Sequence, residues 1–247
     1  MSADPLPGGP PGGAGSTRAR PSSADGLVLA GLVPLSTCDW PDRLVATVFL
    51  QGCPWDCGYC HNPDLIDPRR PGTATWSQVR DLLARRRGLL DGVVFSGGEP
   101  TRQPALADAM REVREAGYGV GLHTGGAYPR RLLDVLPLVD WVGLDIKGPR
   151  SRYAAVTGVA SSGDRAFESL RLVLAAGVPV QVRTTVDPVA LTEDDLAELR
   201  GTLAALGVHD HALQEVRTTG VRREYAGALA TTLSRASALT GAIRGRS

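Results

Sequence analysis

Short apolar runs alternate along the chain with longer segments in which apolar residues recur every three or four positions. The short runs are continuous and rich in β-branched residues, the pattern of buried strands. The longer segments have the spacing of amphipathic helices. The predicted strands span 44–50, 92–95, 119–122, 141–144, 178–185 and 208–216. The predicted helices span 76–87, 103–116, 128–135, 164–176 and 192–206, with a final helix near 225–239.

Capping residues support several of these helix boundaries. Thr75 precedes the first predicted helix, and a threonine hydroxyl accepts from the unpaired amides at a helix N-terminus. Gly117 and Gly177 follow the second and fourth helices, where glycine tolerates the left-handed conformation that ends a helix. Thr192 opens the fifth helix, and acidic residues in the first turn complement the helix dipole.

Regular alternation of strand and helix predicts an α/β fold in which right-handed crossovers join parallel strands. About six strand–helix units are too few for a complete eight-unit barrel. We therefore expect an open, partial β/α barrel of about six parallel strands, or a doubly wound sheet. In both architectures the chemistry belongs at the C-terminal ends of the strands.

Composition sets the expected domain boundaries. Residues 1–26 are rich in proline, glycine, serine and alanine, and such a stretch buries too little apolar surface to order itself. We expect a disordered tail over 1–26 and a single domain over 27–243.

The apolar content of 43% is enough for a sizeable core. The net charge is +1 and the basic residues are scattered, which argues against nucleic-acid binding.

The sequence predicts neither a membrane helix nor a secretory signal. No run approaches the ~20 apolar residues that a membrane helix needs, and the N-terminus lacks the apolar core of a secretory signal. We expect a cytoplasmic protein with no membrane partner, in which thiols stay reduced. Four cysteines in such a protein favour metal binding over disulfides. Three of them lie close together, and Cys38 stands apart, where we expect packing or no particular role.

Cys53, Cys57 and Cys60 directly follow the first predicted strand. Their loop contains glycine and proline and can wrap three thiolates around an iron–sulfur cluster or zinc. A structural zinc site normally has four protein ligands, and His61, next to Cys60, would supply a fourth only in a cramped geometry. Three thiolates leave one iron of a [4Fe–4S] cluster open to an outside ligand, which favours chemistry over a structural role.

Polar motifs also follow the second and sixth predicted strands. Gly97, Gly98 and Glu99 end the second strand; paired glycines let a backbone approach a ligand closely, and a carboxylate accepts from an ammonium group. An ordinary turn is the alternative for this motif taken alone. Gln214 and Arg217 follow the sixth strand, where they could close a pocket.

The third, fourth and fifth predicted strands end on further candidates. His123 and Thr124 end the third strand, and Asp145 and Lys147 end the fourth. Arg183 ends the fifth, and a guanidinium pairs bidentately with a carboxylate. The structural alternatives are a buried imidazole at His123, a surface ion pair for Asp145 with Lys147, and structural pairing for Arg183.

The Cx3Cx2C spacing, with the aromatic Tyr59 before the last cysteine, resembles the cluster motif of the radical S-adenosylmethionine (SAM) superfamily. The resemblance implies a [4Fe–4S] cluster on the three cysteines, SAM as the second cofactor, and a radical SAM domain of the partial-barrel type. It also implies that Gly97–Glu99 hold the amino group of SAM and that Arg183 meets its carboxylate. Tyr59, His123 and Thr124 join these as candidate cofactor-binding residues.

A narrower resemblance is to the proteins that activate glycyl radical enzymes. Residues 144–147 are similar to their Leu-Asp-Leu-Lys, which makes Asp145 and Lys147 candidate catalytic residues. Cys-His-Asn-Pro at 60–63 and His-Thr-Gly-Gly at 123–126 are similar to anaerobic ribonucleoside-triphosphate reductase activating proteins. Where other activating proteins commonly have Asp-Thr-Asn-Gly, His123 replaces the aspartate and Gly125 the asparagine. This chain therefore lacks the carboxylate that a cation site there would use.

The reaction implied by this resemblance needs two partners. A one-electron donor such as flavodoxin or ferredoxin reduces the cluster, and the cleavage of SAM yields methionine and a 5′-deoxyadenosyl radical. That radical takes a hydrogen atom from a glycine of a glycyl radical enzyme, here an anaerobic ribonucleotide reductase.

Two other functions stay open. One is a radical SAM enzyme that acts on a small molecule, as in a 7-carboxy-7-deazaguanine synthase-like ring contraction. The other is a non-catalytic iron–sulfur or zinc protein, which would not cleave SAM. The chain has no cysteines for a ferredoxin-like insert between residues 60 and 97 or for auxiliary clusters near residue 247, which argues against the members that carry them.

Overall fold

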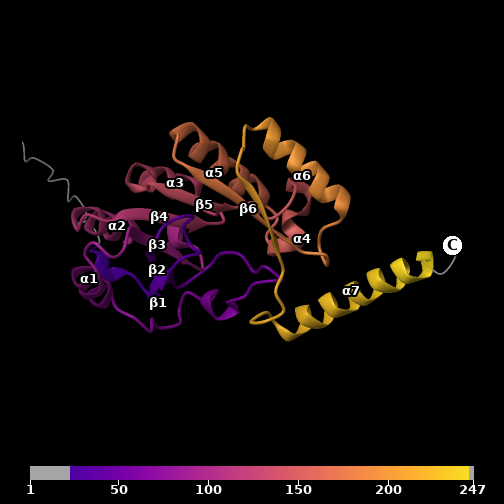
Figure 1. The fold of residues 1–247 in the computed structure, drawn as a ribbon, viewed down its shortest axis with the longest axis horizontal. Helices are drawn as coiled ribbons and strands as arrows, with labels where there is room; N and C mark the ends of the chain where they lie inside the picture. The colour runs from indigo at the N-terminus through magenta and orange to yellow at the C-terminus, as the bar shows by residue number, and fades with distance from the viewer. Residues whose placement is uncertain (1–22, 245–247) are drawn as a thin grey trace, which may run out of the picture.

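Seven strands form one sheet, and their order in space follows their order in the chain (Figure 1). The computed structural model describes residues 23–244, with side-chain surroundings up to Ser234. The strands are β1 (Leu29–Ser36), β2 (Val45–Leu50), β3 (Gly92–Gly97), β4 (Gly119–Thr124), β5 (Trp141–Asp145), β6 (Val180–Val186) and β7 (His211–Glu215). Neighbouring strands from β2 to β7 are parallel, and β1 pairs antiparallel with β2.

Six of the seven α-helices in the described residues overlap segments that apolar spacing and capping predict, and α4 is the exception. They are α1 (Trp76–Arg85), α2 (Leu106–Glu115), α3 (Pro129–Val135), α4 (Tyr153–Thr157), α5 (Ser162–Ala176), α6 (Glu193–Ala205) and α7 (Arg223–Arg244). Thr75 and Thr192 each form a reciprocal capping box with the third residue of the helix that follows. Gly177 ends α5 in the left-handed conformation, with φ of 67°. Within residues 23–244, no helix combines the length and the apolar character needed to cross a membrane.

The sequential strand order decides between the two expected architectures. A doubly wound sheet reverses its strand order at one point, so that helices cover both faces. Here the order has no reversal, and crossovers of one hand place α2, α3, α5 and α6 along the same side of the sheet (Figure 1). The strands β1 and β7 remain separate edges. The predicted open, partial barrel with six parallel strands is confirmed.

The sequence pattern did not predict β1 or α4, and one predicted boundary needs correction. Residues 29–35 of β1 are apolar throughout, but Gly31 and Pro34 interrupt the run with residues that strands disfavour; Pro34 is tolerated there because β1 lies at an edge. The helix α4 is too short to show a helical period. The expected tail reaches Gly26, but Ala24–Gly26 form a short 3-10 helix with Ala24 fully buried. Residues 1–22 of that tail lie outside the described residues.

A small aromatic cluster on the concave face closes the N-terminal end of the barrel, apart from the main core between sheet and helices. Trp40, between β1 and β2, stacks on Trp141 with 5.7 Å between ring centroids. Glycines on the strands make room for it, since a Cβ on Gly121 would lie 2.9 Å from the Trp40 ring. The C-terminal end of the barrel is left for the candidate residues.

We expect Trp40→Ala to lower the free energy of unfolding by about 3–5 kcal/mol, because it removes a ring that is 9% exposed and leaves a cavity. Urea unfolding followed by circular dichroism measures the change. The control is Leu89→Ala, at a side chain that is 60% exposed, which should change the free energy by less than about 0.5 kcal/mol. Equal effects of the two substitutions would show that Trp40 does not stabilise the barrel.

Candidate functional site

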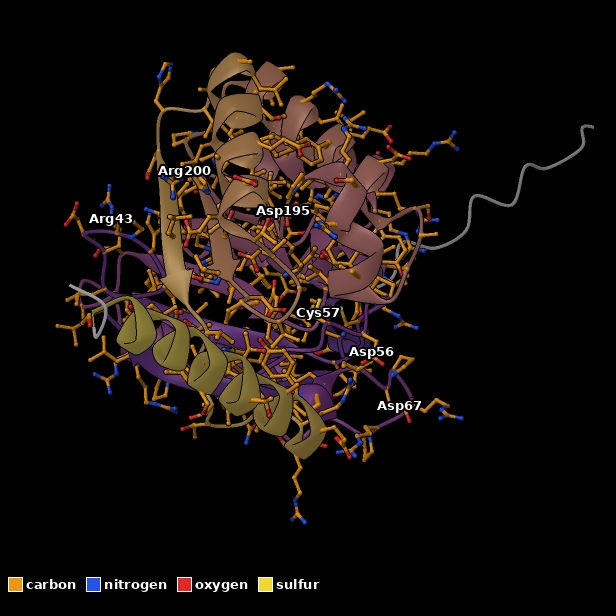
Figure 2. All side chains as sticks on the ribbon, turned by 90° about the vertical axis from the view of Figure 1, so that its right-hand side faces the viewer. Arg43, Asp56, Cys57, Asp67, Asp195 and Arg200 are labelled. Atoms are coloured by element: carbon orange, nitrogen blue, oxygen red, sulfur yellow. The ribbon has the colours of Figure 1, made fainter. Side chains whose placement is uncertain are left out.

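A cavity of about 240 Å³ opens at the C-terminal ends of the parallel strands. Its walls come from the loops after β2 and β4 and from the ends of β3, β5, β6 and β7. In Figure 2, Asp56, which follows β2, lies far across the molecule from Arg43, which precedes β2. The cavity is therefore at the edge of the sheet where the sequence places its polar motifs.

All three clustered cysteines, Cys53, Cys57 and Cys60, line this cavity. The amide of Cys53 donates to the carbonyl of Ile66 at 3.1 Å, and the amide of Cys60 donates to the carbonyl of Cys57 at 3.0 Å. Burial raises the pKa of Cys53 to about 12 and also raises the pKa of Cys57, because a thiolate loses its hydration there. A metal centre that binds these thiols has to displace their protons.

The chemistry of the three thiols bears on what they can hold. Thiolates bind zinc and iron–sulfur clusters, and a structural zinc site normally takes four protein ligands. Three cysteines line this cavity, and three thiolates would leave one iron of a [4Fe–4S] cluster open to an outside ligand. The donor set fits such a cluster.

Two aromatic side chains beside the cysteines have unused polar atoms. Trp55 and Tyr59 are buried and line the cavity. Neither Trp55 Nε1 nor Tyr59 Oη has a hydrogen-bond partner among the described residues. The Nζ of Lys147 lies 6.0 Å from the Trp55 ring centroid and 5.6 Å from the Tyr59 ring centroid, within reach of a cation–π interaction. Buried polar atoms are normally paired, so both atoms are suited to meet a bound ligand.

Glu99 is a buried carboxylate, 2% exposed, in the cavity wall. Its Oε1 accepts from the hydroxyls of Thr101 and Thr124 at 2.5 and 2.7 Å and from the Thr101 amide at 3.1 Å. Its Oε2 accepts from the amide of Gly125 at 3.0 Å. Burial raises the pKa of Glu99, and these hydrogen bonds oppose the rise. With one partner, Oε2 retains the capacity to accept from a ligand.

The paired glycines before Glu99 are required by the protein's own packing. Gly97 has φ of 109°, and a Cβ there would lie 2.4 Å from the Leu50 nitrogen. A Cβ on Gly98 would lie 2.5 Å from the Gly52 carbonyl oxygen. This close approach lets the Glu99 amide donate to the Gly52 carbonyl at 2.9 Å. The carboxylate is thereby fixed relative to the cysteine loop.

Asp145 and Lys147 bring an ion pair to the same cavity. From β6, Arg183 donates through Nε to Asp145 Oδ1 at 2.9 Å, and its Nη2 lies 2.8 Å from the same oxygen. The Nζ of Lys147 lies 3.6 Å from Asp145 Oδ2. Burial alone would raise the pKa of Asp145, but the two cations hold it below its ordinary value. Burial alone would lower the pKa of Lys147, but the acidic groups around it raise it.

His123 lies outside the cavity lining and contacts Arg183, the partner of Asp145. Its Nε2 lies 2.6 Å from the Asp39 carbonyl oxygen, and its Nδ1 lies 3.3 Å from the Ser96 hydroxyl. A carbonyl can only accept, so Nε2 donates to Asp39 and Ser96 donates to Nδ1. Arg183 Nη1, 3.1 Å from Nε2, then faces a second donor. Burial and this guanidinium lower the pKa of His123 to about 4, so the ring is neutral.

The structure divides the predicted residues into those that line the cavity and those that support it. Tyr59, Gly97–Glu99, Asp145, Lys147 and the three cysteines line it, as does Gln214. Thr124, His123 and Arg183 are not among the lining residues. Thr124 holds Glu99, and Arg183 holds Asp145.

Some cavity residues were absent from the sequence prediction. Trp55 belongs to the cysteine loop itself, and Thr185 belongs to β6. His61 and Asn62 also line the cavity, and the sequence pointed to them only through the motif at 60–63 and, for His61, as a cramped fourth zinc ligand. Thr185 follows Arg183 by two positions and so projects from the same face of the strand, a spacing that could have revealed it. Nothing in the local pattern distinguishes Trp55 from a core residue.

Comparison with known proteins agrees with this geometry. A family model described as the radical SAM superfamily matches residues 47–206. Over 183 residues the chain is 29% identical to a protein of Methanocaldococcus jannaschii whose name assigns it provisionally to the glycyl-radical enzyme activating enzymes, covering 71% of this chain and 75% of that protein. Over 148 residues it is 34% identical to the pyruvate formate-lyase-activating enzyme of Clostridium pasteurianum, covering 57% of this chain and 61% of that enzyme.

A solved structure shares the fold. Streptococcus suis SuiB bound to S-adenosylmethionine superimposes with a TM-score of 0.57 at 14% identity, over 70% of this chain and 41% of SuiB. The chain thus spans less than two thirds of the length of SuiB and of the Clostridium enzyme.

The buried neutral imidazole of His123 predicts a loss of stability in acid. The unfolded chain binds a proton at this residue near the ordinary pKa of 6.5, whereas the folded protein resists protonation down to about 4. The free energy of unfolding should therefore fall as pH drops from 6.5 to about 4, by on the order of 2 kcal/mol from this group. Urea unfolding at several pH values measures it. His123→Gln should flatten this part of the profile, and His209→Gln, at an exposed site, should not; identical profiles for all three proteins would contradict the assignment.

Proposed function

The chain belongs to the radical SAM superfamily, and from this membership we propose that it forms a glycyl radical on a partner enzyme, an anaerobic ribonucleoside-triphosphate reductase. Members of this superfamily use a [4Fe–4S] cluster and SAM. Three thiols, the Glu99 carboxylate and the Asp145–Lys147 pair line one cavity, and this shared lining is the observation that carries the proposal. Relatives named for activating glycyl radical enzymes support a glycine substrate. The motifs at 60–63 and 123–126 support the reductase as partner.

Different side chains would bind the cluster and SAM. The three cysteines would bind three irons and leave the fourth open. Glu99 would accept from the amino group of SAM through Oε2, because hydrogen bonds from Thr101, Thr124 and Gly125 already hold the carboxylate in place. When bound, the cluster and SAM supply a carbon-centred radical that removes hydrogen from the substrate.

Lys147 is the better candidate for the carboxylate of SAM. Unlike Arg183, Lys147 lines the cavity, and Asp145 fixes its ammonium from one side. Arg183 would then act through Asp145, whose Oδ1 it already occupies. The indole and phenol of Trp55 and Tyr59 exclude water around the ammonium and have a free donor each for the cofactor.

The open barrel supports a macromolecular substrate. Because β1 and β7 do not pair with each other and the barrel stays open, a glycine-bearing loop of the partner would reach the cavity from the open side. An external one-electron donor, flavodoxin or ferredoxin, would supply the reducing electron. We place this system in the cytoplasm.

The cysteine variants test the cofactor assignment. After anaerobic reconstitution and reduction, the wild-type protein should bind about four irons per chain and convert SAM to methionine and 5′-deoxyadenosine. Substituting Cys53, Cys57 or Cys60 by Ala should abolish both. Cys38→Ala is the matched control, because Cys38 is exposed and outside the cavity lining, and it should leave both unchanged. A fully loaded wild-type protein that does not cleave SAM would rule out the proposed activity.

Glycyl-radical formation needs its own test. The loaded protein, SAM and a reductant are incubated with the anaerobic reductase from the same genome, and electron spin resonance should then record a glycyl doublet. A reductase whose candidate glycine is replaced by alanine is the control and should give none. Cleavage of SAM that is stimulated by a pterin-like compound, with no doublet on the reductase, would favour the small-molecule alternative.

A further inference from the structure

The chain after β7 turns back across the loop that carries Cys57 and Cys60. We propose that Thr219, Gly220, Arg222 and Tyr225, here called the clasp, hold this half of the loop in place, and that Arg222 and Tyr225 are positioning residues for the cluster. The inference rests on the proposed function in one respect, that the loop holds a cluster. The contacts between the clasp and the loop do not depend on that function.

The first part of the clasp contacts the two ends of the Cys57–Cys60 segment. Arg222 forms an ion pair with Asp56, the residue before Cys57. The imidazole Nδ1 of His61, the residue after Cys60, donates to the Thr219 carbonyl at 3.2 Å. Gly220, with φ of 85°, passes so close to His61 that a Cβ there would lie 2.6 Å from the His61 carbonyl oxygen. Both flanks of the segment are therefore held by the same short stretch of chain.

Tyr225, in the first turn of α7, supplies the second part. A Cβ on Gly58, between Cys57 and Cys60, would lie 3.1 Å from the Tyr225 ring, so the ring packs directly against the loop backbone. The Tyr225 hydroxyl donates to Asp187 Oδ1, at the end of β6, at 2.5 Å. Tyr225 is 8% exposed and Asp187 is 2% exposed. The ring is thus anchored to the sheet while it covers the loop.

The opposite side of the same segment rests on α4. The amide of Asp56 donates to the Thr157 carbonyl at 2.9 Å, and the amide of Gly58 donates to the Val156 carbonyl at 3.3 Å. The segment is therefore held between α4 and the clasp. Cys53 differs, because its amide is bonded within its own loop, to Ile66. Retention of two of the three ligands thus depends on α4 and on the clasp, whose Arg222 lies 166 positions from Asp56.

A charge-reversal experiment tests the clasp on the full chain. The variants are Arg222→Asp, Asp56→Arg and the double reversal, with Arg223→Asp as matched control, since Arg223 is the adjacent exposed arginine. Anaerobically loaded proteins are challenged with an iron chelator, and the loss of cluster absorbance gives the release rate. Each single reversal should speed release by roughly twofold to fivefold, as expected for the loss of one partly exposed ion pair. The double reversal should return the rate to near the wild-type value, and Arg223→Asp should not change it.

A second variant and a second measurement separate the clasp from the cluster. Tyr225→Phe keeps the ring on Gly58 and removes the hydrogen bond to Asp187. In the metal-free protein, this variant and both single reversals should speed amide hydrogen exchange in residues 56–61 relative to wild type. Wild-type rates of exchange and release in all of these variants, or a double reversal as fast as the singles, would overturn the clasp. Failure of the wild-type protein to load a cluster would instead overturn the proposed function, while the exchange rates would still decide the clasp.

Discussion

Parallel pairing of the strands from β2 to β7 is the constraint on which the rest of the molecule depends. Because these strands run in one direction, their C-terminal ends meet at one rim, and the residues that follow them share one cavity. The register of the strand pairing also sets how far each strand end reaches toward the cavity. Leu50 on β2 pairs with Gly97 on β3, and Asp145 on β5 pairs with Arg183 on β6. Sequential order keeps the helices to one side, so the other face stays free to curve around the cavity.

Buried charge explains why the supporting residues matter as much as those that line the cavity. An unpaired buried carboxylate is costly by several kcal/mol, and the two carboxylates in the cavity wall each have a partner on another strand. Glu99 is held by Thr124 on β4, and Asp145 by Arg183 on β6. Gly143 on β5 lies between His123 and Arg183 and has no room for a side chain. A Cβ there would lie 2.8 Å from the His123 ring and 3.0 Å from the Arg183 guanidinium. His123 and Arg183 therefore approach each other over a glycine, where a larger residue on β5 would push them apart.

The cysteine loop combines local and distant support in a way that its spacing does not reveal. The segment around Cys53 is closed by backbone hydrogen bonds to residues 65 and 66, within the same loop. The segment from Asp56 to His61 instead lies between α4 and the chain that leads into α7. A short motif defines the ligands, whereas their relative positions depend on elements from the far end of the chain.

The sequence alone determined the alternation of strands and helices, the capped helix ends and the motifs at the strand ends, because these follow from periodicity and from contacts over a few residues. It was enough to predict the three thiols, Gly97–Glu99, Asp145 and Lys147 as neighbours. Only the tertiary structure decided that the sheet forms an open barrel and not a doubly wound sheet. It also revealed the edge strand β1 and showed which candidate residues line the cavity. The cavity is not lined by Thr124, His123 or Arg183. Hydrogen bonds to residues 25 to 84 positions away in the sequence orient these side chains elsewhere. Such long-range pairings leave no period in the sequence.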